Sequence, residues 1–157
     1  MTDDIEIRLR SLEDRLAIME LEGAYARCFD SRDGDGWAAL FTEGGVYQAR
    51  GATAAGGGSF VRGRPQLSKF CQDANYDGLH FLHLPQITFL GDRATSRVHL
   101  DFAGVFHGAD APMIRMIGYY DVAYVREKGH WLIERRVTTT LSRDTRQNLG
   151  YPRESGL

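Results

Sequence analysis

The sequence has 157 residues, 43% of them hydrophobic, so we expect one domain over 1–157, with its core at about 10–141. The formal net charge of −2 and the lack of a polybasic stretch argue against nucleic acid or a membrane surface as a partner. The two cysteines form no C-x-x-C pair, and the acidic N-terminus does not resemble a signal peptide. No apolar run approaches the ~20 residues that a membrane span needs. We therefore expect a cytoplasmic protein.

The N-terminal part of the chain is predicted to form a helix over residues 11–29 that ends near Asp30. Two apolar stripes lie side by side on this helix, so we expect one wide face that packs on a sheet. The first stripe holds Leu12, Leu16, Met19 and Gly23, and the second holds Ile18, Leu21, Tyr25 and Cys28 or Phe29.

Short elements follow the first helix. The pattern predicts helices over 36–42 and 65–74, with Pro65 in the first turn of the latter, and a strand over 46–49 between them. The glycine-rich segment Gly51–Ser59 indicates a mobile loop, which could serve as a lid.

The second half of the chain reads as strands over Leu79–Leu90, Ala94–Phe106, Met113–Arg126 and His130–Leu141, before a polar tail over 142–157. Helices followed by a long antiparallel sheet indicate the α+β class. A strongly curved sheet would wrap around the first helix.

Asp30 and His80 are the two residues with the clearest chemical potential. If the fold brings them together, the carboxylate accepts the imidazole N–H and fixes its tautomer, which leaves the other ring nitrogen as a general base. Alternatively, Asp30 caps a turn and His80 is an ordinary strand residue. Strand alternation turns His83 away from His80 and His99 away from the core, so we expect no metal site.

Three blocks of sequence resemble a known family. They comprise Leu21–Asp33 with 37–42, then His80–Leu82 with Ile87 and 91–94, and finally 118–121 with 124–126, Trp131 and Arg135-Arg136. In this order and spacing they resemble the SnoaL-like members of the NTF2-like superfamily, over roughly residues 10–140.

The resemblance implies a cone-shaped α+β barrel, in which a curved mixed or antiparallel sheet wraps the N-terminal helices around a deep apolar pocket. His80 would abstract a proton and Asp30 would hold it, without any cofactor. We therefore expect a lyase that eliminates from or cleaves a small cyclic or aromatic substrate, as a dehydratase, a dehydrohalogenase or a retro-aldol enzyme. The alternatives are an isomerase or cyclase, and a non-catalytic ligand-binding or dioxygenase small-subunit-like protein.

Further site residues are proposed around this pair. Tyr25 is the third catalytic candidate, because its phenol could donate a hydrogen bond to a carbonyl or a departing group; it could equally be a core aromatic. Arg135 and Arg136 alternate faces, and we assign Arg135 to the pocket, with a solvated or interface charge as the alternative. The remaining candidates for substrate binding are aromatic: Phe29, Trp37, Tyr47, Phe102 and Tyr120.

The sequence departs from the best-known family members at three positions. Scytalone dehydratase has a tyrosine at the position of Phe29 and a histidine near the position of Gly104. Hexachlorocyclohexane dehydrochlorinase, another member of the superfamily, has a lysine at the position of Tyr25. The resemblance thus supports proton transfer without naming a substrate. It also implies a homo-oligomer, a trimer rather than a dimer, through the convex sheet face that would carry Arg97 and His99.

Overall fold

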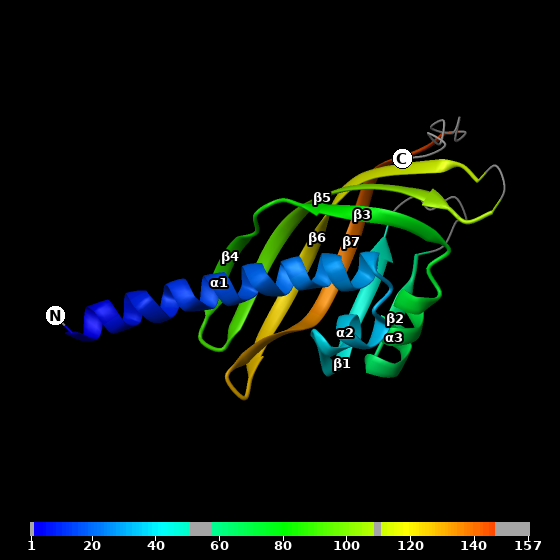
Figure 1. Cartoon of the computed structure of the whole chain (residues 1–157). Helices are drawn as coiled ribbons and strands as arrows, with labels where there is room; N and C mark the ends of the chain where they lie inside the picture. The colour runs from blue at the N-terminus through cyan, green and yellow to red at the C-terminus, as the bar shows by residue number, and fades with distance from the viewer. Residues whose placement is uncertain (1, 51–57, 109–110, 147–157) are drawn as a thin grey trace, which may run out of the picture.

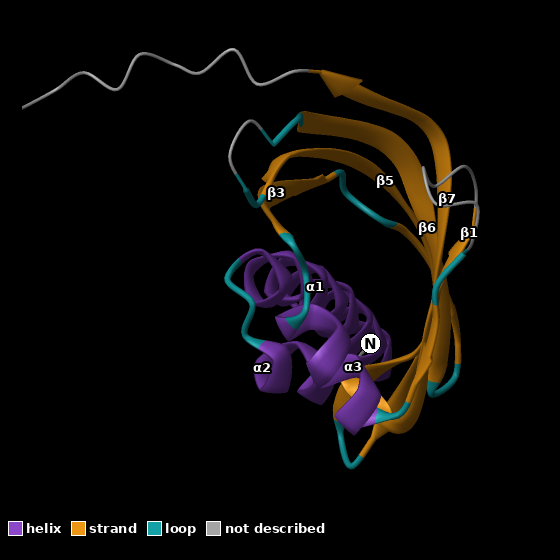
Figure 2. Ribbon diagram, turned by 90° about the vertical axis from the view of Figure 1, so that its right-hand side faces the viewer, coloured by secondary structure: helices purple, strands orange, loops and turns teal. Residues whose placement is uncertain are grey.

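Helices pack into the concave face of a curved sheet in the computed structural model, which describes residues 2–50, 58–108 and 111–146 (Figure 1, Figure 2). The seven strands follow the order β2-β1-β7-β6-β5-β3, and β4 pairs with β5 beside β3. The β1–β7 pair is parallel and the other pairs are antiparallel. The predicted α+β class and the curved mixed sheet are confirmed, and the sheet stays open at its edges.

The elements have the following bounds. The helices are α1 (Thr2–Asp30), α2 (Gly34–Ala39) and α3 (Arg64–Gln72). The strands are β1 (Phe41–Arg50), β2 (Phe60–Arg62), β3 (Tyr76–Leu82), β4 (Gln86–Leu90), β5 (Arg93–Phe106), β6 (Met113–Glu127) and β7 (His130–Arg146). Within the described ranges, no helix is both long enough and apolar enough to cross a membrane.

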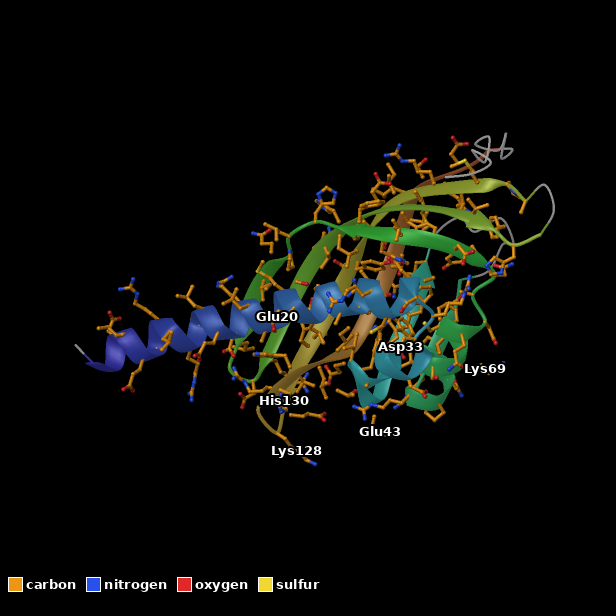
Figure 3. All side chains as sticks on the ribbon, viewed as in Figure 1. Glu20, Asp33, Glu43, Lys69, Lys128 and His130 are labelled. Carbon is orange, nitrogen blue, oxygen red and sulfur yellow. The ribbon has the colours of Figure 1, made fainter. Side chains whose placement is uncertain are left out.

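Helix α1 ends where the sequence predicted. Its last residue is Asp30, and Arg32 then takes a left-handed backbone conformation with φ 57°, which turns the chain. The next helix begins at once, because the Asp33 carboxylate accepts a hydrogen bond of 2.9 Å from the Gly36 N–H (Figure 3). Asp30 is thereby held at a fixed corner between two helices.

The prediction that both apolar stripes of α1 pack on the sheet as one wide face was wrong. Only the second stripe packs against the sheet, with Ile18 fully buried. In the first stripe, Leu12 is 59% exposed and Leu16 is 58% exposed. The helix begins at Thr2, and its N-terminal part projects past the sheet (Figure 1).

The single strand predicted over Leu79–Leu90 was also wrong. It breaks after Leu82 and resumes at Gln86, and both pieces pair with β5. Pro85 lies in the break, where a residue without an N–H cannot continue the ladder. His83 lies in the same break and is exposed, with its ring centroid 6.3 Å from that of His99.

Other boundaries moved by a few residues. β1 begins at Phe41, so it takes the end of the helix predicted over 36–42, and β7 continues to Arg146, inside the predicted tail. β2 was not predicted. Most of the predicted lid, residues 51–57, and residues 147–157 lie outside the described part of the chain.

A bulge in β7 changes which side chains enter the interior. Ile133 pairs with Tyr124 and Arg135 pairs with Ala123, so Glu134 has no partner in β6. Alternation counted from Ile133 would place Arg135 inside, but the extra residue shifts the count by one. Arg136 is therefore fully buried, while Arg135 is exposed.

Candidate active site

The structure brings Asp30 and His80 into direct contact. His80 Nδ1 lies 2.5 Å from Asp30 Oδ1, and the His80 backbone N–H donates to Oδ2 at 3.0 Å. The side chains are only 7% and 14% exposed, respectively. Asp30 thus holds both the ring and the backbone of His80. With Nδ1–H donating to the carboxylate, Nε2 is the ring nitrogen left to accept a proton.

The elements that carry this pair fix it from both sides. Asp30 is the last residue of α1, and His80 is in the middle of β3, where it pairs with Phe102 of β5. Aromatic rings surround the imidazole: the ring centroids of Phe102, Phe29 and Tyr25 lie 4.8, 5.3 and 6.4 Å from that of His80. The histidine therefore lies in an aromatic environment that limits the access of water.

Two glycines make room for the ring of Phe102, which packs against His80. Gly78 of β3 faces Gly104 of β5, and a Cβ at Gly78 would lie 2.4 Å from Phe102 Cζ and 2.7 Å from the Ala103 carbonyl oxygen. A Cβ at Gly104 would lie 2.9 Å from the same Cζ and 2.7 Å from the Asp77 carbonyl oxygen. At both positions glycine lets the Phe102 ring lie close to the strands.

We expect Gly78→Ala to move Phe102 and with it His80. Overpacking of this kind costs about 1–3 kcal/mol of stability, and the displaced ring should also lower turnover. Urea unfolding and an activity assay measure the two effects. Gly44→Ala is the matched control, because its Cβ would meet no atom within 4 Å. Equal behaviour of the two variants would show that the close approach at Gly78 has no effect on the site.

A second buried cluster joins α1 to β7. Arg136 donates to both carboxylate oxygens of Glu22, at 2.8 and 2.9 Å. The Tyr124 hydroxyl donates to Glu22 Oε1 at 2.7 Å and lies 2.7 Å from Ser96 Oγ. Since Glu22 and Arg136 are both buried, each needs the other to compensate for lost hydration.

The Arg136 guanidinium is placed between two tyrosine rings. Its Cζ lies 3.7 Å from the Tyr25 ring centroid and 3.8 Å from that of Tyr120. Burial raises the pKa of both phenols well above the usual value, and the charge of Arg136 opposes that shift. Burial alone would lower the pKa of Arg136, but Glu22 raises it overall. The interior therefore holds a permanent cation next to neutral phenols, which are hydrogen-bond donors.

This cluster corrects the assignment of Arg135 to the pocket. Arg135 lies on the outer face, where it donates to Gln48 Oε1 at 2.8 Å and lines a hollow of about 670 Å³ with Arg97 and Asp121. Arg136 takes the interior position because of the bulge at Glu134. Sequence reasoning also missed Glu22, although an acidic residue within an apolar helix face is a usable signal.

The other proposed aromatic residues line the same interior. Trp37 is fully buried, 5.4 Å from Tyr25 between ring centroids, and its Nε1–H has no hydrogen-bond partner among the described residues. The Tyr47 hydroxyl accepts a hydrogen bond of 3.1 Å from Thr138. Tyr120 and Phe102 are also buried. Their contact with a substrate, and an apolar pocket beside His80, stay predictions.

No cluster of three His, Cys, Asp or Glu side chains in the described ranges is arranged to hold a metal ion. His83 and His99 are both exposed on the outer side of the sheet, away from the Asp30–His80 contact.

A SnoaL-like domain matches residues 10–137, which is most of the chain. The chain belongs to the SnoaL-like family. The matched region includes both Asp30 and His80, as well as the buried Glu22–Arg136 pair. A comparison with curated protein sequences finds no match.

Solved structures share the fold of this SnoaL-like chain. An NTF2-like protein with a cystatin-like fold from Novosphingobium aromaticivorans is 25% identical, with 89% of this chain and 90% of that one covered and a TM-score of 0.75. A type 2 hexachlorocyclohexane dehydrochlorinase is 14% identical, with 95% and 99% covered and a TM-score of 0.81. A putative scytalone dehydratase from Novosphingobium aromaticivorans is 21% identical, with 96% and 99% covered and a TM-score of 0.68. The last two show the shared fold alone.

Proposed function

We propose that this SnoaL-like protein is a cofactor-independent lyase that acts on a small cyclic or aromatic substrate, with the Asp30–His80 pair as its general base. The observation that carries the proposal is the 2.5 Å contact between His80 Nδ1 and Asp30 Oδ1 at a largely buried position. A buried carboxylate that orients a histidine is the usual arrangement for a base that takes a proton from a substrate.

In this mechanism Nε2 of His80 removes a proton from a carbon of the substrate, and Asp30 stabilises the imidazolium that forms. The electron pair of the broken C–H bond becomes the new double bond, and a group on the adjacent carbon departs with its own electron pair. Tyr25 is the candidate hydrogen-bond donor to that group, since burial keeps its phenol neutral. Arg136, whose charge is paired with Glu22, lies over the Tyr25 ring and opposes the burial-driven rise in the pKa of this phenol.

The lining of the interior supports the proposed substrate class. Phe29, Trp37 and Phe102 are buried around the same interior as His80, and in the proposed pocket they would offer ring surfaces to an apolar cyclic molecule. Two buried N–H groups, Trp37 Nε1 and Arg136 Nε, have no hydrogen-bond partner among the described residues, and both side chains lie against Tyr25. Such groups are commonly satisfied by water or a ligand. A ring with one polar substituent would fit both features.

Elimination is proposed ahead of other proton transfers for two reasons. The interior places the neutral Tyr25 phenol beside the base, with ring centroids 6.4 Å apart, and a hydrogen-bond donor there suits a departing group. In addition, two solved structures of the same fold are a dehydrochlorinase and a putative dehydratase. Because one fold hosts many activities, this second reason is an analogy between folds.

The test is a panel of cyclic alcohols, halides and β-hydroxy ketones incubated with the protein in D₂O, with products followed by mass spectrometry. We expect loss of water or of a hydrogen halide. A product of unchanged mass that has gained deuterium would point to an isomerase with the same base. A panel left without either product or deuterium would contradict a general base at this site.

Asp30→Asn tests the role of the carboxylate directly. Removing its charge leaves the imidazolium without support, so we expect turnover to fall by about 10²-fold or more. Proton NMR provides a readout that needs no substrate: the low-field signal of the hydrogen-bonded Nδ1–H should disappear in the variant. Asp33→Asn is the control, because the Asp33 carboxylate caps α2 by accepting a hydrogen bond from the Gly36 N–H, whereas Asp30 accepts from His80. Unchanged turnover in folded Asp30→Asn would overturn the assignment.

A further inference from the structure

The exposed side of α1 carries an apolar seam, which we define as Ile5, Leu9, Leu12, Leu16 and Met19. These residues are 62%, 53%, 59%, 58% and 38% exposed. Their spacing alternates between four and three residues, which is the a/d spacing of a coiled coil. The seam lies away from Ile18 and Tyr25, which face the sheet.

Nothing in the described part of the chain covers this seam. All residues from Asp4 to Glu13 are exposed, and the first side chain fixed to the body is Asp14, which accepts hydrogen bonds from Arg126 at 2.5 Å and from Trp131 Nε1 at 3.0 Å. The helix projects past the sheet edge with its side chains directed into solvent (Figure 1, Figure 3). A projecting helix with apolar side chains in water gains stability mainly by packing on a partner.

Charges of opposite sign border the two sides of the seam. Glu6, Glu13 and Glu20 follow one side at seven-residue intervals, and Arg8 and Arg15 follow the other. Glu20 projects from α1 in Figure 3. In coiled-coil terms the acidic residues occupy e positions and the basic residues occupy g positions, the positions that set the partner and its direction.

We propose that this seam binds the same seam of a second copy of the chain, with the two α1 helices parallel. In a parallel pair each g residue faces the e residue five positions later on the other helix. Arg8 then meets the partner's Glu13, and Arg15 meets the partner's Glu20. In an antiparallel pair g faces g and e faces e, so Arg8 and Arg15 would meet arginines and the glutamates would meet glutamates. The charge pattern therefore selects a parallel second copy as the occupant.

The first test compares two neighbouring apolar residues of similar exposure. Leu9 lies on the seam, whereas Ile7 is 69% exposed and lies off it. We expect Leu9→Glu to halve the mass of the assembly in sedimentation equilibrium, and Ile7→Glu to leave it unchanged. A monomeric wild-type chain, or a Leu9→Glu variant with the wild-type mass, would overturn the proposal.

The second test reads the direction of the helices. It uses Arg8 and Glu13, since Arg15 also stands over the Phe89 ring of the same chain, with its Cζ 5.2 Å from the centroid. Arg8→Glu should raise the dissociation constant of the assembly several-fold, and Arg8→Glu with Glu13→Arg should restore it, because the pair still has opposite signs when parallel. Failure of the double variant to recover would rule out the parallel arrangement. Circular dichroism confirms that each variant keeps its fold.

Discussion

Replacing His80 with alanine is expected to abolish most of the activity while the fold survives. The side chain supplies the proposed base, and general base catalysis is worth about 10²–10⁴-fold, so turnover should fall by at least about 10²-fold. The measurement is steady-state turnover of the substrate found in the panel. Most of the loss should appear in kcat, because the aromatic rings that would bind the substrate remain.

His99→Ala is the matched control for this variant. His99 is a strand histidine like His80, but it is exposed on the outer face of β5. Its loss should leave turnover unchanged. A folded His80→Ala protein with wild-type turnover would remove the dyad from the mechanism, whatever the substrate.

Glu22→Ala is expected to have the largest effect on stability. The substitution leaves the buried Arg136 charge without its bidentate partner and removes an acceptor from Tyr124. Breaking a buried ion pair from one side costs about 3–5 kcal/mol, which is a large part of the stability of an ordinary domain. Urea unfolding followed by circular dichroism measures the difference.

Two further variants separate charge burial from lost packing. Glu134→Ala removes one partner of the Arg93–Glu134 pair, whose side chains are 62% and 40% exposed, so it should change stability little. Glu22→Leu combined with Arg136→Met removes both buried charges and should recover much of the loss. If the double variant were as unstable as Glu22→Ala, packing rather than the unpaired charge would explain the effect.

The sequence predicted most elements because their apolar patterns are regular. Along β5, buried Ala94 and Val98 alternate with exposed Thr95 and Arg97, as period-two spacing requires. The contact between Asp30 and His80 could not be predicted in this way. Pattern alone left it open, and the family resemblance supplied the expectation of contact.

Predictions from the sequence failed where the local pattern and the tertiary packing disagree. The bulge at Glu134 has no signature in the sequence, yet it decides that Arg136 enters the interior instead of Arg135. The two stripes of α1 look equally apolar, but the sheet covers only one of them. An apolar pattern shows that a helix face tends to be buried, but it does not show whether that face packs on the same chain or on another molecule.

The Glu22–Arg136 pair has a consequence for how the molecule folds. The two residues are 114 positions apart, near opposite ends of the chain, whereas Asp30 and His80 are 50 apart. Contacts of such long range require large loops to close, which slows folding. During synthesis α1 emerges before β7, and the Glu22 carboxylate has no counter-charge until β7 has left the ribosome. The buried Glu22–Arg136 pair is therefore completed late, by the last described strand of the chain.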